Sequence, residues 1–164
     1  MASTIWGEPR FTQDVDLVVD LRSEHIPEFV RLVSPDWYVD SELVQRAVER
    51  CTSFNLIRLT RMVKVDVFVP PNEGLHQSKW ARAVRQLVDP EGGRSLDITS
   101  PEDILLQKLS WYRAGDCVAD SQWRDVTALL RIRGASLDRA YLDEWALRLG
   151  LESLLARARS ESDA

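Results

Sequence analysis

The pattern of apolar and polar residues is clearest in a segment near the start of the chain. It runs from Arg10 to Asp20 and contains a short apolar run, Leu17-Val18-Val19, that is rich in β-branched residues and bounded by charge. Such a run is typical of a buried strand. Because side chains alternate between the two faces of a strand, Asp14 and Asp16 are expected on the same face, roughly 7 Å apart. Two carboxylates at this separation repel each other unless a positive charge lies nearby.

A second segment, Met62 to Val69, alternates more strictly. Its valines fall on one face of the expected strand, and Lys64 and Asp66 fall on the other. An aspartate between valines is costly to bury without a partner. This cost disappears if Asp66 faces the same polar site as Asp14 and Asp16.

The rest of the pattern predicts an α/β (α+β) fold with two parts, a mixed-sheet core over residues 1–99 and a helical subdomain over residues 100–164. In the first part we expect helices over residues 1–6, 24–33, 42–51 and 75–87, and strands over residues 14–21, 54–59, 62–69 and 95–98. In the second part we expect helices over residues 101–112, 120–134, 137–150 and 151–159.

The first helix of the second part has a clear start signal. Ser100 is a good capping residue, Pro101 suits the first helical position, and Glu102 and Asp103 lie where the helix dipole favours acids. Asp103 takes the place of the usual Glu or Gln in an approximate capping box. We therefore expect this helix to begin directly after Ser100.

Composition and charge narrow the class of protein. The 164 residues are 45% hydrophobic and 29% charged, and the formal net charge of −5 argues against binding nucleic acid through overall basicity. No apolar run approaches the roughly 18–20 residues that span a bilayer, and no signal-peptide pattern opens the chain. The two cysteines and two histidines are too few for a disulfide framework or a well-supported zinc site. We expect a cytoplasmic protein without a membrane partner.

The chemistry that Asp14, Asp16 and Asp66 favour together is the binding of a divalent metal. Mg²⁺ takes oxygen ligands and is usually held by one or two carboxylates plus substrate phosphates. An Asp-x-Asp pair alone is better explained as a solvated strand end that carries acids. The third acid, on a separate strand, shifts the balance towards a metal site.

Four motifs, in order along the chain, resemble those of the nucleotidyltransferase superfamily. They are most similar to the motifs of the AbiEii/AbiGii toxin type and of small stand-alone nucleotidyltransferase-like proteins near that group. Each motif is weak alone, but the four together, in a strand, strand, helix, helix context over about residues 2–155, are fairly specific. The motifs are Arg10-x-Thr12-x-Asp14-x-Asp16-Leu17, Lys64-Val65-Asp66-x-Phe68, Pro101-Glu102-Asp103-x-x-x-x-Lys108-Leu109 and Arg124-Asp125-Val126.

The resemblance implies a role for each matching residue. Asp14 and Asp16 would be catalytic metal ligands, and Asp66 would be the third acid, which helps to activate the acceptor. Lys108 matches the lysine that faces the triphosphate, and Asp125 matches an acid near the base or metal end of the site. The other candidate nucleotide-binding residues are Ser3, Arg10 and Thr12.

Several of these residues also have an ordinary structural explanation. Lys108 could simply extend its aliphatic chain along the apolar side of its helix. Whether it does so or binds the triphosphate, we expect its ammonium group to be solvated. Asp125 is explained by a surface ion pair with Arg124. Arg10 and Thr12 are equally explained by turn and hydrogen-bonding roles at the start of the strand.

One part of the family pattern is missing. The family has a Gly-Ser pair at the end of an earlier strand, where a backbone turn holds the nucleotide phosphates. Counting back from Asp14, this pair would fall before Met1. Either the start codon is misassigned, or the chain is a shortened relative with weaker phosphate binding. In both cases we expect the strand over residues 14–21 to expose an edge, and the protein to dimerise or aggregate at high concentration.

The resemblance implies a metal-dependent nucleotidyltransferase that uses Mg²⁺ or Mn²⁺. Such an enzyme moves NMP from an NTP to a hydroxyl group of RNA, a protein or a small molecule. The resemblance also implies a role in a toxin–antitoxin or phage-defence system, with a cognate antitoxin or toxin as partner. The alternative is a catalytically inactive nucleotidyltransferase-like binding or antitoxin module.

Overall fold

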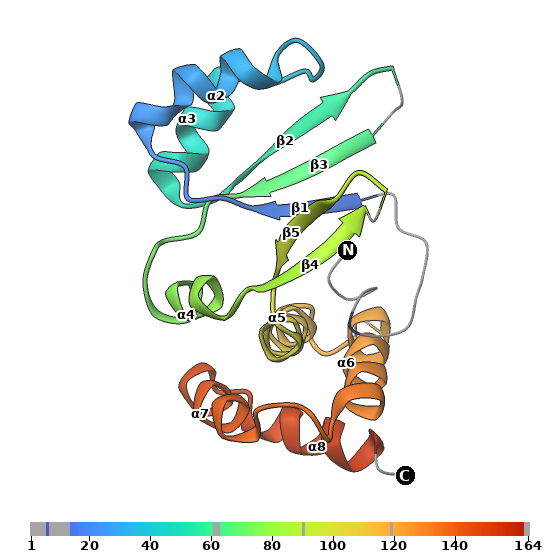
Figure 1. Ribbon diagram of the computed structural model, residues 1–164. Helices are drawn as coiled ribbons and strands as arrows, with labels where there is room; N and C mark the ends of the chain where they lie inside the picture. Colours follow the sequence, from blue (N-terminus) through green and yellow to red (C-terminus); the bar gives the residue numbers. More distant parts are fainter. Residues whose placement is uncertain (1–5, 7–13, 61–62, 90, 119, 163–164) are drawn as a thin grey trace. The chain divides into compact units, whose positions relative to one another are not determined.

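The computed structural model describes residues 6, 14–60, 63–89, 91–118 and 120–162 (Figure 1). The fold is α+β, with two β-sheets and a helical C-terminal part, as the sequence predicts. The chain divides into two compact units. We call the described residues between 14 and 76 the sheet unit, and Trp6 with the described residues from 77 to 162 the helical unit.

The described part of the sheet unit is a three-stranded mixed sheet with two α-helices over one face and a short 3-10 helix before the first of them (Figure 1). Its central strand, β3, runs parallel to β1 and antiparallel to β2, which gives the order β1-β3-β2. The strands are β1 (Asp14–Val18), β2 (Ser53–Arg58) and β3 (Val63–Phe68), and the helices are η1 (Ser23–His25), α2 (Ile26–Val33) and α3 (Ser41–Arg50).

The core of the sheet unit lies between these helices and one face of the sheet. Strict alternation along β3 turns Val65 and Val67 into the core, while β2 contributes Phe54 and Leu56. Burying one such side chain stabilises the fold by roughly 1.5–3 kcal/mol, so this face fixes the register of the strands. The helices complete the core with Ile26, Val44 and Ala47.

β1 lies at the edge of the sheet. Among the strands that the structure describes, it is hydrogen-bonded only to β3. Leu17 is 40% exposed and Val18 is 45% exposed, which is unusual for apolar residues in a strand. The expected exposed strand edge is therefore present among the described residues.

The described part of the helical unit contains the second half of α4, a β-hairpin and four further helices, in that order along the chain after Trp6 (Figure 1). Its core is formed mainly by leucines of α5, α6, α7 and α8, with Leu105, Leu109 and Leu142 at most 1% exposed. The chain enters this unit within α4 (Gly74–Arg82), and the other elements are β4 (Val84–Asp89), β5 (Arg94–Ile98), α5 (Pro101–Ala114), α6 (Asp120–Arg133), α7 (Arg139–Leu149) and α8 (Glu152–Ser162).

The predicted start of α5 is confirmed. Ser100 is the N-cap residue, and its Oγ accepts a hydrogen bond of 3.2 Å from the backbone N–H of Asp103. Pro101 occupies the first helical position. Both Ser100 and Asp103 are buried, so this cap belongs to the interior of the helical unit.

The expected helix over residues 75–87 is wrong in its second half. α4 ends at Arg82, and Val84 begins β4, which pairs in antiparallel fashion with β5. Residues 84–87 and Asp89 gain cross-strand partners in the hairpin, Leu87 opposite Ser95, and this tertiary pairing overrides the weak helical pattern.

The sequence predicts a boundary between two parts at residues 99/100, and the compact units of the structure divide the chain elsewhere. The chain passes from one unit to the other between His76 and Gln77, inside α4. The β4–β5 hairpin thus groups with the helices that follow it. Of the expected helix over residues 1–6, only Trp6 lies within the described residues, where it is buried and its Nε1 donates a 2.7 Å hydrogen bond to the Thr99 carbonyl.

None of the helices among the described residues is both long and apolar enough to cross a bilayer.

Candidate functional site

Two of the predicted acids lie side by side on the face of the sheet that α2 and α3 leave uncovered. In the parallel register of β1 and β3, Asp16 is the direct partner of Asp66. Neighbouring strands are about 4.8 Å apart, and aligned residues of parallel strands point to the same face. Asp16 is exposed and Asp66 is partly buried. The sheet therefore brings these two carboxylates together, as the strand patterns predict.

Two further polar residues extend this site across the sheet. Lys64 Nζ lies 3.0 Å from Asp66 Oδ2, and Lys64 is also the register partner of Asp14. On the other side of β3, Asn55 of β2 is the partner of Asp66. We call Asp16, Lys64, Asp66 and Asn55 the acid-face site.

Sequence reasoning missed Asn55 as part of this site. Its polar position between Phe54 and Leu56 shows that it faces away from the core. Its alignment with Asp66 depends on the register between two strands, which the sequence alone does not show.

The other candidate residues at this end of the chain are only partly described. Asp14 is the first residue of β1, but the structure does not describe its side chain. Ser3, Arg10 and Thr12 also lie outside them.

The donor set of the acid-face site matches part of what a magnesium ion needs. Asp16 and Asp66 would supply two carboxylates, the number by which Mg²⁺ is commonly held when substrate phosphates complete its shell. Among the side chains that the structure describes, no group of three or more His, Cys, Asp or Glu could hold a metal. The described residues therefore offer two carboxylates here, one of which, Asp66, is already paired with Lys64.

Lys108 and Asp125 form an ion pair inside the helical unit. Lys108 Nζ lies 2.6 Å from Asp125 Oδ2 and also donates a 3.1 Å hydrogen bond to Gln122 Oε1. The Lys108 side chain is only 6% exposed and that of Asp125 is 19% exposed. The expectation of a solvated Lys108 head is therefore wrong, because α6 supplies two oxygen acceptors where α5 presents the lysine. Asp125 therefore makes a contact between helices, with Lys108, that the expected surface pair with Arg124 does not include.

A larger buried polar network, which sequence reasoning also missed, surrounds Asp103. Tyr141 of α7 donates a 2.6 Å hydrogen bond to Asp103 Oδ1, and Ser100 donates one of 2.8 Å to Oδ2. Burial raises the pKa of Asp103, although these hydrogen bonds and the charges of Lys79 and Arg82 oppose the change. The sequence pattern around Asp103 predicted only a capping role within its own helix. It did not predict a partner on another helix.

Two neighbours of Asp103 also have shifted pKa values. Burial lowers the pKa of Lys79, with the charge of Asp103 acting in the opposite direction. Burial and the hydrogen bond to Asp103 raise the pKa of Tyr141 above its ordinary value. The network thus holds charged groups in a poorly solvated environment.

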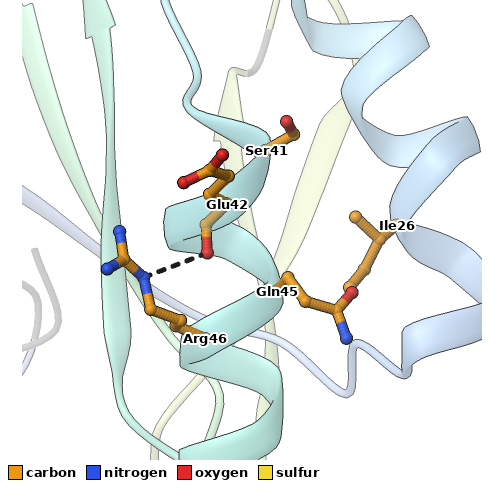
Figure 2. A pocket seen from close by; sticks show the side chains of 5 residues that line it. All are labelled: Ile26, Ser41, Glu42, Gln45 and Arg46. Atoms are coloured by element: carbon orange, nitrogen blue, oxygen red, sulfur yellow. Dashed lines mark hydrogen bonds between the residues drawn. The ribbon is translucent and has the colours of Figure 1, made fainter.

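A shallow depression in the sheet unit is separate from the acid-face site (Figure 2). It lies along α3 at the start of α2, in the helical layer that covers the valine face of the sheet. In it, Arg46 Nε donates a 3.3 Å hydrogen bond to the backbone carbonyl of Glu42. Its lining residues are Ile26, Ser41, Glu42, Gln45 and Arg46, and none was predicted to be functional.

Comparison of the sequence with models of known protein families and with curated proteins gave no match.

Proposed function

We propose that this chain is a metal-dependent nucleotidyltransferase, which transfers NMP from an NTP to a hydroxyl acceptor. The observation that carries the proposal is the side-by-side placement of Asp16 and Asp66 on the face of the sheet opposite α2 and α3. Two carboxylates held this close favour binding of a cation between them. The four motifs that resemble those of nucleotidyltransferases supply the reaction class.

In the proposed reaction, the acceptor oxygen attacks the α-phosphorus of the NTP, and the bond to the pyrophosphate group breaks. Bound Mg²⁺ would neutralise the phosphate oxygens and orient them for in-line displacement. Asp16 would hold the phosphate-bearing end of the nucleotide through this cation. Asp66 would accept the proton of the acceptor hydroxyl. Lys64 neutralises Asp66 at 3.0 Å before substrate binds, and it would move towards the phosphates as they arrive.

The experiment is incubation of the full chain with Mg²⁺ or Mn²⁺ and each labelled NTP, with total RNA or cell lysate as acceptor. We expect label transfer to an acceptor that falls at least about 100-fold in Asp16→Asn and in Asp66→Asn, because each loses a group that acts on the reacting atoms. Asp20→Asn is the matched control, since Asp20 follows β1 and pairs only at 3.6 Å with Arg22 in an exposed position. Transfer that survives both site substitutions would refute the proposal.

A second candidate function is a non-catalytic binding or antitoxin module of the same fold. It is favoured by two ion pairs, because Asp66 is paired with Lys64 and Lys108 is paired with Asp125. Both lysines then have structural partners without a nucleotide. Absence of transfer with every NTP, together with tight binding of the protein from a neighbouring gene, would favour this module over the enzyme.

A further inference from the structure

α4 is attached to the helical unit in an unusual way. None of its residues is fully buried, and its apolar Trp80 is 41% exposed. The helices on which it lies, by contrast, have well-buried leucines such as Leu105 and Leu142. Apolar burial therefore contributes little to the position of α4, and another kind of contact must hold it.

Polar side chains supply these contacts. Ser78 Oγ lies 3.0 Å from the Tyr141 hydroxyl, and Lys79 Nζ donates a 3.1 Å hydrogen bond to Gln107. The first contact joins α4 to α7, and the second joins α4 to α5. Each is a single hydrogen bond, which contributes roughly 0.5–1.5 kcal/mol net, or more where one partner is charged.

Arg82 makes the strongest of these polar contacts. Its guanidinium lies 3.2 Å from Glu102 Oε2 and 3.5 Å from Asp138 Oδ2, and it stacks 4.0 Å from the centre of the Tyr141 ring. Glu102 is 5% exposed, and its other oxygen accepts a 2.9 Å hydrogen bond from the Asp138 backbone N–H. One arginine thus connects α4 to both α5 and α7.

We propose that α4 is a polar clasp, a helix docked on α5 and α7 by side-chain hydrogen bonds and ion pairs, which opens as a unit while those helices remain folded. The helices beneath it keep their own leucine core when it leaves. The charges that it covers are held at a cost, since burial raises the pKa of Asp103 and lowers that of Lys79. Opening returns both groups to water, and their hydration offsets part of the free energy needed to break the hydrogen bonds and ion pairs of α4.

Opening of the clasp would change the connection between the two units. With α4 docked, the chain between β3 and α4 is residues 69–73, whereas with α4 undocked the free chain extends over residues 69–83 to the start of β4. A free helix of nine residues is too short to be stable by itself, so α4 would also unfold once undocked. At about 3.3–3.6 Å per residue, the maximum reach of the extended chain then rises from roughly 17 Å to roughly 50 Å. The chain passes from one unit to the other inside α4, between His76 and Gln77, so opening of the clasp would lengthen this connection.

Hydrogen exchange of the full chain, followed by mass spectrometry or NMR, tests the clasp. In the unaltered protein we expect the α4 amides of residues 78–82 to exchange about ten-fold or more faster than those of residues 143–149 in α7, after correction for intrinsic rates. α7 is the matched comparison, because it is of similar length and contacts the same network. Equal protection of the two helices would mean that α4 opens only with the whole unit, and would overturn the proposal.

A pair of variants tests which contacts hold the clasp. Arg82→Gln combined with Glu102→Gln removes both charges of the main ion pair without leaving either one buried alone. We expect a further ten-fold or greater acceleration in α4, with α5 and α7 unchanged. The control is Arg85→Gln, which removes the exposed pair with Asp97 at 3.1 Å on the adjacent hairpin and should leave α4 unchanged. Acceleration of all three helices together in the double variant would also overturn the proposal.

Discussion

Single residues contribute strongly to the free energy of unfolding, and the ion pair of Lys108 with Asp125 in the helical unit is the clearest case. Lys108→Ala would leave Asp125, which is only 19% exposed, without the amine that neutralises it at 2.6 Å. Removal of one partner of a buried ion pair costs about 3–5 kcal/mol. We therefore expect a loss of this size in the free energy of unfolding, measured by urea denaturation.

Arg148→Ala is the control for this prediction. Arg148 pairs with Glu144 at 2.6 Å on the surface of α7, with both side chains more than half exposed. Its removal should cost under about 0.5 kcal/mol. Similar small losses for both variants would contradict the buried environment of Lys108. Because Lys108→Ala acts on stability first, any change in its NTP affinity must be measured on the folded fraction.

The sequence predicts much of the acid-face site and little of the polar networks, for a physical reason. Alternation along one strand shows which residues share a face, so the grouping of Asp66 with Lys64 is readable from the chain. Which residue of another strand or helix lies opposite depends on tertiary packing. Tertiary packing decides three contacts that the sequence does not show: Asp66 with Asn55, Lys108 with Asp125, and Asp103 with Tyr141.

At the scale of elements, the buried Asp103 links helices α5 and α7 through Tyr141, and its titration gives a test of this link. Burial raises its pKa in the folded state above the unfolded value of about 3.9. Such a group adds stability that is fully present below the unfolded pKa and is lost as the pH rises through the folded pKa.

Asp103→Asn should therefore remove a pH-dependent term from the stability. The wild type is expected to be most stable relative to this variant near pH 4 or below, and to lose that advantage as the pH rises towards neutrality. Urea denaturation of both proteins across this range measures the difference. Asp97→Asn, in an exposed pair on the β4–β5 hairpin, is the control. If the wild type instead becomes more stable relative to Asp103→Asn as the pH rises, ion pairing dominates over burial at this carboxyl.

The length of α4 shows why element boundaries are harder to predict than element types. Strands β1 and β3 and the start of α5 lie close to their expected positions. Residues 83–89 carry no strong period, so their state depends on the partner strand β5. Local pattern decides the structure where it is strong, and pairing with distant residues decides it elsewhere.

At the scale of the whole molecule, the edge position of β1 predicts self-association. Leu17 and Val18 are exposed on a strand that pairs on one side only among the described strands. An exposed apolar edge tends to recruit another strand. We expect sedimentation velocity to show concentration-dependent association, which Val18→Lys weakens because a charged residue on an edge opposes pairing. Leu147→Lys, at a 67% exposed position of α7, is the control. Association that is unaffected by Val18→Lys would place the contact elsewhere.

The pairing of β1 with β3 also limits how this gene can vary. A single codon inserted between Val15 and Asp16 would put these two residues on the same face, because side chains alternate at every residue. Either the carboxylate would then face the core, or Val15 would face water. Two codons would restore the alternation but would separate Asp16 from Val15 by roughly 7 Å more, so only one of them could keep its partner on β3. Insertions and deletions in this strand should be far rarer among descendants of this gene than substitutions.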